Sequence, residues 1–388
     1  MKYEHRFMNE LLRIVGGALR LDIDRVRNYT AFLADKLENE GDKSAATRLR
    51  KLLAESDHQL RPTDATFSRT LPVDSESRFA LIERVNLSGF DETPMVLSQE
   101  QWDIVHEFLS VAKSYAQLDA EGVAGSISML MYGPPGTGKN RLAAHIAKEL
   151  GLELYVARLD GLISSFLGST SKNIRALFDF AAKTPCVMFL DEFDAIAKLR
   201  GDTQELGELK RVVNSFIQNL DALGPQSIIL AATNHEELLD AAVWRRFGYR
   251  LQLGFPSSEL RQSMWKAFLK PIEFGEREID MLTDLSEGFS GSDIQEVGRR
   301  LNRRRITLKA RPELKDAFTI LQNVGIGEGE HRRFMSTFKG LSTNEIAAAL
   351  RKRKPKLYSM AAVGHLLGVS KATAYRSIRG AFDDGRTK

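Results

Sequence analysis

The sequence predicts an α/β fold in which a parallel sheet is sandwiched by helices, followed by a small helical lid and flanked by all-helical appendages at both ends. Three observations support this. Short apolar runs alternate with amphipathic stretches between Ile127 and Pro256. A glycine-rich loop joins the first run to a helix-like stretch. Several runs are almost wholly apolar, as parallel strands covered on both faces should be.

The central part of the chain is expected to contain five strands. They are predicted at residues 127–132, 152–157, 187–190, 228–232 and 251–253. A helix over residues 99–118 should precede them, because Trp102, Val105 and Phe108 recur on one face at helical spacing. Residues 257–310 are helical in pattern and are expected to make the smaller lobe.

The N-terminal part indicates three short helices within residues 7–55. Leu11 and Val15 belong to the first apolar stripe, and the Glu40-Gly41-Asp42 break separates the second helix from the third. Such a module can select substrates or adaptors, or it can serve oligomerisation. Residues 56–96 are polar and irregular, with one strand-like run at 79–82, and are interpreted as a linker.

These patterns divide the chain into five parts. The predicted boundaries are 1–56 for an N-terminal helical bundle, 57–96 for a linker, 97–256 for a large α/β subdomain, 257–325 for a helical lid and 326–388 for a basic C-terminal region.

Composition suggests a cytoplasmic protein. The chain has 388 residues, of which 43% are hydrophobic and 27% charged. It has no apolar run of the roughly 18–20 residues that a membrane span needs. Residues 1–6 lack the apolar core of a secretory signal. Cys186 is the single cysteine and is expected to be a small buried side chain.

Charge is unevenly distributed along the chain. Residues 296–388 contain 21 Lys and Arg against 8 Asp and Glu, a net charge of +13, while the remainder carries −9. Two interpretations stay open for this basic region: a solvated helical surface, or contact with nucleic acid or another acidic partner.

The glycine-rich loop predicts a nucleotide site. A strand, a glycine-rich loop and a helix in this order are the context of a phosphate-binding loop, whose backbone N–H groups and helix N-terminus attract phosphate. The alternative is a glycine-rich turn without a ligand. The candidate residues for binding ATP are Gly133, Pro134, Pro135, Gly136, Thr137, Gly138, Lys139 and Asn140. Lys139 is expected to reach the β- and γ-phosphates.

Asn140 departs from this pattern. A serine or threonine normally follows the lysine, and its hydroxyl binds Mg²⁺. An amide oxygen can also bind a hard cation, but the side chain is longer and carries an NH₂ group. Asn140 therefore bears on Mg²⁺ binding and on hydrolysis, whereas the loop glycines and Lys139 predict nucleotide binding.

Polar residues that follow two apolar runs supply the chemistry of hydrolysis. Asp191 and Glu192 end one strand, where Asp191 would hold Mg²⁺ and Glu192 would polarise the attacking water. Asn234 ends another strand and could hydrogen-bond this water or the γ-phosphate. Arg245 and Arg246 follow closely, and in a ring they would reach the γ-phosphate of the neighbouring subunit.

In these ordered motifs the chain resembles the AAA family of ATPases, which have a P-loop NTPase fold. It is most similar to the single-ring group that includes the microtubule-severing and ESCRT-disassembly ATPases. The resemblance covers residues 97 to about 310. It includes the lid motif at 288–293, which implies that Gly291 and Ser292 lie beside the nucleotide. It also implies a homo-oligomeric ring, in the form of a hexamer.

The resemblance further implies a protein substrate. Phe166, Leu167 and Gly168 match the family's first pore loop, in which an aromatic side chain projects into the channel, and the second loop would lie at 198–208. The alternative is that Phe166 is a core residue. An aromatic ring in a channel can grip a polypeptide without sequence preference. Position 239 is Leu, so residues 235–239 do not complete a zinc-protease motif, and any proteolysis would need a separate protease partner.

The C-terminus resembles a helix-turn-helix. Two short helix-like stretches flank Gly368-Val369-Ser370, with Ser370 as the expected cap of the second. If the second helix entered a DNA groove, the candidate contacts would be Lys371, Thr373, Tyr375 and Arg376. The basic run at 351–356 is a candidate for gripping phosphates.

Three functions therefore stay open. The first is an ATP-driven ring that remodels or threads protein substrates. The second is an ATPase recruited to DNA through its C-terminus. The third is a nucleotide-dependent scaffold that hydrolyses ATP slowly because of Asn140.

Overall fold

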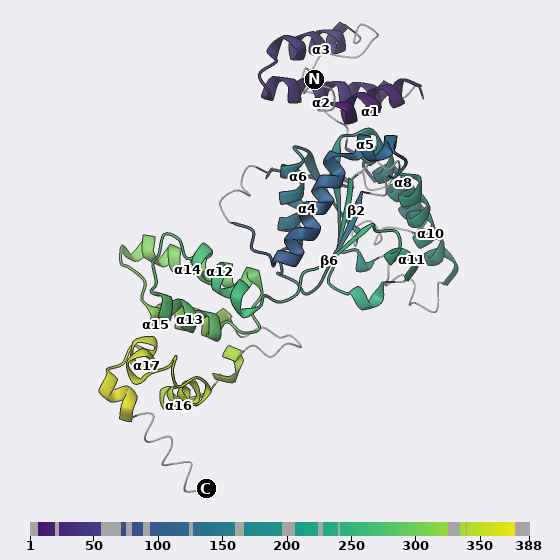
Figure 1. The fold of residues 1–388 in the computed structure, drawn as a ribbon. Coiled ribbons are helices and arrows are strands. Elements are labelled where there is room, and N and C mark those ends of the chain that lie inside the picture. Colours follow the sequence, from purple (N-terminus) through teal and green to yellow (C-terminus); the bar gives the residue numbers. More distant parts are fainter. Residues whose placement is uncertain are drawn as a thin grey trace. The chain divides into compact units, whose positions relative to one another are not determined.

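The computed structural model describes residues 7–19, 23–55, 71–74, 80–87, 94–123, 127–159, 167–195, 206–223, 228–239, 241–324, 334–338 and 340–376. The chain forms two compact units (Figure 1). Unit 1 comprises residues 1–91, 99–133 and 139–252. Unit 2 comprises residues 92–98, 134–138 and 253–388, so most of the glycine-rich loop belongs to it.

Unit 1 is built around one mostly parallel sheet, which confirms the predicted α/β fold. Within the described residues it has six strands in the order β1-β3-β4-β5-β2-β6. Only β1 is antiparallel to its neighbour. The strands are β1 (Glu83–Val85), β2 (Ser128–Tyr132), β3 (Glu153–Arg158), β4 (Cys186–Asp191), β5 (Ile228–Thr233) and β6 (Tyr249–Gln252).

Helices cover both faces of this sheet (Figure 1). Helices α4 (Gln99–Lys113) and α6 (Lys139–Glu149) lie on one face, and α8 (Leu167–Lys183) and α10 (Leu206–Ala222) lie on the other. Shorter helices are α5 (Tyr115–Ala120), η2 (Glu236–Leu238) and α11 (Ala241–Trp244). Residues 187–190 of β4 are fully buried, as is expected for a central strand with a helix layer on each side.

The predicted strands agree with the observed ones to within two residues, except for the outermost strand β1. There the strand-like run was expected at 79–82, but β1 begins at Glu83 and pairs with β3. Leu81 and Ile82 are buried in the core of unit 1 instead. Burial against the sheet accounts for their apolar character, so the expected strand position was wrong.

The N-terminal helices confirm the three predicted segments. They are α1 (Met8–Leu19), α2 (Ile23–Asn39) and α3 (Lys43–Glu55), and they pack consecutively on one another. They also contact α5 and α8. The first apolar stripe is not a core, however, because Leu11 and Val15 are exposed. The side chains that are buried instead include Tyr29, Leu33 and Ala34 of α2.

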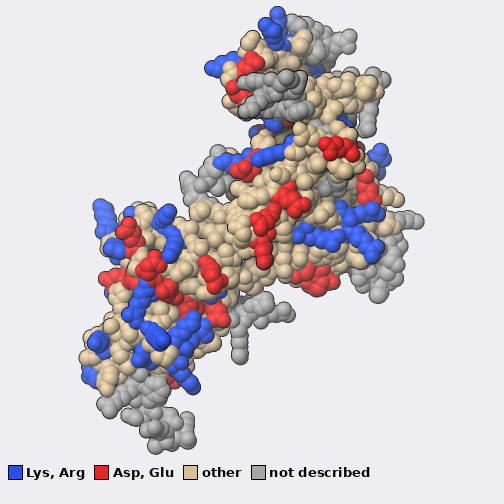
Figure 2. All heavy atoms as spheres, viewed as in Figure 1, with Lys and Arg blue, Asp and Glu red and all other residues tan. Residues whose placement is uncertain are grey.

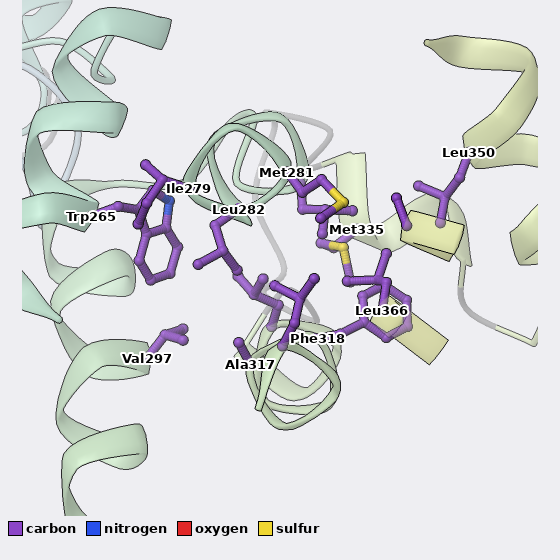
Figure 3. Packing of buried hydrophobic residues seen from close by; sticks show 14 of the residues in the cluster. Trp265, Ile279, Met281, Leu282, Val297, Ala317, Phe318, Met335, Leu350 and Leu366 are labelled. Atoms are coloured by element: carbon purple, nitrogen blue, oxygen red, sulfur yellow. The ribbon is translucent and has the colours of Figure 1, made fainter. Parts of the chain in front are cut away.

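Unit 2 is helical and has one continuous core. Its elements are α12 (Ser258–Phe268), α13 (Glu276–Leu285), α14 (Gly291–Leu308), α15 (Leu314–Val324), η3 (Phe334–Phe338), α16 (Thr343–Arg353) and α17 (Met360–Leu367), followed by a helical segment at 371–376. Figure 3 shows Trp265, Val297, Phe318, Leu350 and Leu366 packed in this core. The lid and the C-terminal helices therefore share one hydrophobic cluster.

A buried carboxylate also ties the C-terminal helices to the lid. Asp284 of α13 accepts hydrogen bonds from Arg353 at 3.2 Å and from the Tyr358 hydroxyl at 2.7 Å, and Lys354 Nζ lies 2.5 Å from it. Arg353 also pairs with Glu287. Because Arg353 and Lys354 belong to the run at 351–356, this part of the run stabilises the fold.

No helix among the described residues is long and apolar enough to cross a membrane.

Candidate functional site

The carboxyl ends of three neighbouring strands bring the predicted catalytic residues together in unit 1. Strand β5 lies between β4 and β2 in the sheet, and all three are parallel. Asp191 ends β4 and Glu192 follows it, Asn234 follows β5, and Gly133 follows β2. Parallel α/β sheets bind ligands at this edge, where the loops after the strands meet.

The glycine-rich loop has the backbone conformation that phosphate binding needs. Gly133, Gly136 and Gly138 have φ values of 134°, 77° and 106°. These values lie in a region that side-chain-bearing residues rarely adopt. The Thr137 hydroxyl donates to the Pro134 carbonyl at 2.9 Å and stabilises the turn. The loop leads directly into α6, which begins at Lys139, so the N-terminus of α6 adds partial positive charge.

Lys139 is the buried cation of the site. Its side chain is 6% exposed, and Nζ donates to the Gly133 carbonyl at 2.6 Å. Burial lowers the pKa of the Lys139 ammonium to about 8, although the nearby acids Asp191, Glu236 and Asp194 favour the charged form. A phosphate anion beside Lys139 would favour the charged ammonium, which burial alone disfavours.

Asn140 lies directly beside Asp191. Its Nδ2 donates to Asp191 Oδ2 at 3.0 Å, while Asp191 Oδ1 accepts from the Glu192 backbone N–H at 2.9 Å. With this orientation the Asn140 Oδ1 remains for a cation. Mg²⁺ is usually held by one or two protein oxygens together with waters and substrate phosphates. The Asn140 amide oxygen and the Asp191 carboxylate therefore fit Mg²⁺ as ligands, although the Asn140 amide N–H competes with the cation for that carboxylate.

Glu192 is held in an unusual backbone conformation. Its φ is 54°, in the left-handed region that is uncommon for residues other than glycine. The neighbouring Phe193 N–H donates to the Ala232 carbonyl of β5 at 2.8 Å, which fixes the segment against the sheet. Non-glycine residues in this region cluster at functional sites, where surrounding contacts maintain the strain. The Glu192 side chain is exposed, as a residue that meets substrate should be.

Two buried polar residues beneath this edge were not predicted as site residues. The Thr233 hydroxyl donates to Asp194 Oδ1 at 3.2 Å and accepts from the His235 N–H at 3.0 Å. Thr233 immediately precedes Asn234, so this pair orients the start of the loop that carries Asn234. A threonine and an aspartate within apolar segments were the signals that could have revealed them.

In unit 2, the loop residue Gly136 contacts the lid motif. Ser292 N–H donates to the Gly136 carbonyl at 3.0 Å. A Cβ built on Gly136 would lie 2.3 Å from Ser292 Oγ and 2.7 Å from Ser290 Oγ. Ser290 caps α14 in a reciprocal pair with Asp293. The predicted residues Gly291 and Ser292 thus lie next to Gly136 of the glycine-rich loop.

The two arginines differ in their surroundings. Arg245 and Arg246 both follow α11 and are exposed. Arg246 Nη2 lies 3.2 Å from Asp221 Oδ2 of α10. No ion pair of Arg245 with another described residue is present. Among the described residues, Arg245 is therefore the arginine of this pair that has no internal ion pair to break before it meets a partner.

The remaining candidates belong to α8, to the helical segment 371–376, or to residues outside the described ones. Phe166 is outside them, as is most of the second loop at 198–208, while Leu167 and Gly168 begin α8. Lys371, Tyr375 and Arg376 are exposed on the helical segment 371–376. Ser370 caps this segment as expected, since its Oγ accepts from the Thr373 N–H at 3.1 Å. Among the described residues no group of three His, Cys, Asp or Glu side chains could hold a metal ion.

Comparisons with known proteins agree with this geometry. Residues 129–255 match the family described as ATPase family associated with various cellular activities (AAA). The chain is 35% identical over 270 residues to the uncharacterized AAA family ATPase y4kL of Sinorhizobium fredii, covering 68% of this chain and 79% of that protein.

Two other relatives are matched over shorter shares of their length. The chain is 30% identical to the ATP-dependent zinc metalloprotease FtsH 3 of Sphaerobacter thermophilus, over 58% of this chain and 47% of that protein. It is 34% identical to the protein SUPPRESSOR OF K(+) TRANSPORT GROWTH DEFECT 1 of Arabidopsis thaliana, over 43% of this chain and 40% of that protein. Because the phosphate-loop geometry, the family match and the extent of the y4kL similarity agree, the chain belongs to the AAA family of ATPases.

Proposed function

We propose that this chain hydrolyses ATP to ADP and phosphate as a homo-oligomeric ring of six subunits, and that the ring remodels or threads protein substrates. One observation carries the proposal. Asp191, Glu192 and Asn234 lie with Gly133, the first residue of the phosphate loop, at the carboxyl ends of the neighbouring strands β4, β5 and β2. A loop that only bound nucleotide would not need an acid held beside it in a strained conformation.

Each residue at this edge has a proposed role in hydrolysis. Backbone N–H groups of the loop and Lys139 bind the phosphates, and the exposed Glu192 carboxylate orients and polarises the attacking water. Asn234 hydrogen-bonds this water or the γ-phosphate. Asn140 and Asp191 would hold Mg²⁺, which neutralises charge on the phosphates when it is bound. Ser292 and Gly291 position the loop from the lid side.

The ring completes the site with an arginine from the adjacent subunit. Arg245 is the better candidate, because Arg246 pairs with Asp221 of its own chain. An arginine supplied by a neighbour is worth roughly 10³–10⁵ in rate where it has been measured. Hydrolysis per subunit should therefore fall when the protein is diluted below its assembly concentration.

Protein remodelling is supported by the sequence of the pore loop. Phe166 followed by Leu167 and Gly168 suits a loop that grips an extended polypeptide. The relative FtsH 3 is named an ATP-dependent zinc metalloprotease, and any proteolysis associated with this chain is proposed to reside in a separate partner. Phe166→Ala should abolish remodelling and leave ATP hydrolysis largely intact. Retention of both activities would contradict the threading proposal.

Two variants test the hydrolytic site. Glu192→Gln should retain nucleotide binding and lose Mg²⁺-dependent phosphate release by at least about a hundredfold, the usual contribution of a positioned base. Glu237→Gln, which changes an exposed acid outside the proposed set, is the control. Phosphate release that is equal in Glu192→Gln and in the native protein would refute the assigned role.

A slowly hydrolysing scaffold is the second candidate, and one contact favours it. The Asn140 Nδ2 group donates to the Asp191 carboxylate that would otherwise face Mg²⁺ alone. Asn140→Thr removes this donor and supplies a hydroxyl. A gain of tenfold or more in phosphate release would support the scaffold, whereas an unchanged or lower rate would show that asparagine serves hydrolysis here.

A further inference from the structure

The second half of α14 carries a concentrated positive charge. Residues 299–311 contain seven Lys and Arg and no Asp or Glu. The buried face of this helix comprises Ile294, Val297, Gly298 and Leu301, so Arg299 and Arg303 lie on the opposite, exposed side. They are four residues apart, which places them on one face about 6 Å apart along the helix axis.

Internal ion pairs neutralise only part of this charge. Arg300 Nε lies 2.8 Å from Glu296, and Arg304 Nη2 lies 3.1 Å from Asp316 of α15. Within the described residues, neither Arg299 nor Arg303 pairs with an acid. Like charges at this spacing on one helix face repel each other and destabilise the helix. The face therefore lowers the stability of the free protein, and an anion would offset that loss.

The turn between the two C-terminal helices packs against the start of α15, which in turn packs against α14. A Cβ built on Gly368 would lie 3.1 Å from Lys315 Cδ, and Lys315 precedes Asp316, the partner of Arg304. Helix α15 contacts both α14 and α17. The turn leads into the exposed Lys371 and Arg376, and Tyr375 is 49% exposed between them. The start of α15, where Lys315 pairs with Glu313 at 2.9 Å, therefore lies between the basic residues of α14 and those of the last described helix.

We propose that these residues form one binding surface for the phosphodiester backbone of nucleic acid, with Arg299 and Arg303 of α14 as its main anchors. The surface is named here the α14 basic face and comprises Arg299, Arg300, Arg303, Lys371 and Arg376. Its ligand is the backbone rather than a base sequence, because guanidinium groups on a helix surface bind phosphate oxygens with fork-like hydrogen bonds.

The composition of the face favours nucleic acid over an acidic protein. Four of its five members are arginine, the side chain whose planar fork fits phosphate best. The exposed Tyr375 can stack on a base, a contact that is tolerant of sequence. On α4 of unit 1, the exposed Glu100, Asp103 and Glu107 share one face and would repel phosphate, and Figure 2 shows acidic side chains there.

Fluorescence anisotropy with the full chain tests the proposal. The probes are a labelled 20-base-pair DNA duplex, an RNA duplex and a DNA single strand of the same length, each measured over a series of salt concentrations. We expect binding that weakens as salt rises. Arg299→Ala with Arg303→Ala should raise Kd at least tenfold and lower the salt slope by about 2, since each lost phosphate contact removes about one unit.

Matched variants separate this surface from general electrostatics. Lys43→Ala with Arg48→Ala removes the same charge from exposed positions on α3 and should leave the Kd within about twofold. Arg299→Lys with Arg303→Lys keeps the charge and should keep most of the salt slope. A thermal melt of each variant establishes that it is folded.

Three outcomes would overturn the proposal. One is the absence of binding to every probe at low salt. Another is an equal loss of binding in the α14 and α3 variants. The third is displacement of the probe by polyglutamate at the same charge concentration as unlabelled duplex, which would identify the face as a site for acidic protein. Stronger binding of RNA, or of the single strand, than of the DNA duplex would support the proposal and define the nucleic acid.

Discussion

Replacing Asp284 tests whether the C-terminal helices are held to the lid by a buried charge network. The Asp284 side chain is 2% exposed and contacts three donors from residues 353–358. Alanine removes the carboxylate, whereas asparagine keeps the shape and an acceptor oxygen but removes the charge. The two variants therefore separate the loss of charge from the loss of all polar contact.

The magnitudes follow from the exposure of the partners. Removing one member of a buried ion pair typically costs about 3–5 kcal/mol. The remaining charges can partly recover solvation, because Arg353 is 31% exposed and Lys354 is 52% exposed. Tyr358 is fully buried, and its hydroxyl would lose its acceptor, at a cost of about 1–3 kcal/mol. We expect a loss of about 3 kcal/mol for Asp284→Ala and about half of that for Asp284→Asn.

Urea unfolding followed by Trp265 fluorescence measures this loss. Trp265 is buried in the same core, and its indole N–H donates to Ser286 Oγ at 3.0 Å. Trp102→Phe and Trp244→Phe in all proteins leave Trp265 as the single reporter. With a slope of about 2 kcal/mol per molar urea, Asp284→Ala should lower the midpoint by about 1.5 M.

The pH dependence supplies an internal check. Burial alone would raise the pKa of Asp284, but the hydrogen bonds from Lys354, Tyr358 and Arg353 outweigh it and lower the pKa. A carboxylate with a depressed folded-state pKa stabilises the protein above its unfolded-state pKa, about 3.9, and loses this contribution as pH falls through the folded-state value. The difference in the free energy of unfolding between the native protein and Asp284→Asn should stay constant from pH 8 to pH 5. It should disappear as the pH falls below about 4.

Either of two results would refute this reasoning. If Asp284→Ala lowers the urea midpoint by less than about 0.3 M, the network contributes little to stability. If the difference in the free energy of unfolding between the native protein and Asp284→Asn does not change as the pH is lowered, the stabilisation does not come from the ionised carboxylate.

Two glycine substitutions give further predictions. Gly136→Ala should weaken nucleotide binding at least tenfold in a calorimetric titration, because its φ is 77° and its Cβ would lie 2.3 Å from Ser292 Oγ. Gly254→Ala, which meets no atom within 4 Å, should bind normally, and equal affinities would contradict the prediction. Gly298→Ala should destabilise unit 2 by about 1–3 kcal/mol, since its Cβ would lie 2.7 Å from the Phe268 carbonyl oxygen. An unchanged urea midpoint would show that α12 and α14 can separate at no cost.

Local patterns were sufficient to predict the sheet and the position of the glycine-rich loop. A strand buried on both faces must be apolar throughout, so β4 and β5 were visible as runs bounded by Asp191 and Asn234. A loop that curls around phosphate must contain residues that tolerate positive φ, so its glycines marked its position. Such constraints act between residues that are close along the chain.

Contacts between distant residues could not be predicted in this way. Residues 351–356 resembled a phosphate-binding run, yet Arg353 and Lys354 pair with Asp284, about 70 residues earlier in the chain. The stripe of α1 resembled a core face but is exposed, and Ser292 meets Gly136 across more than 150 residues. The chemistry of the phosphate loop is thus a property of a short segment. Which charges are neutralised inside the protein, and which remain for a partner, depends on the packing that brings remote segments together.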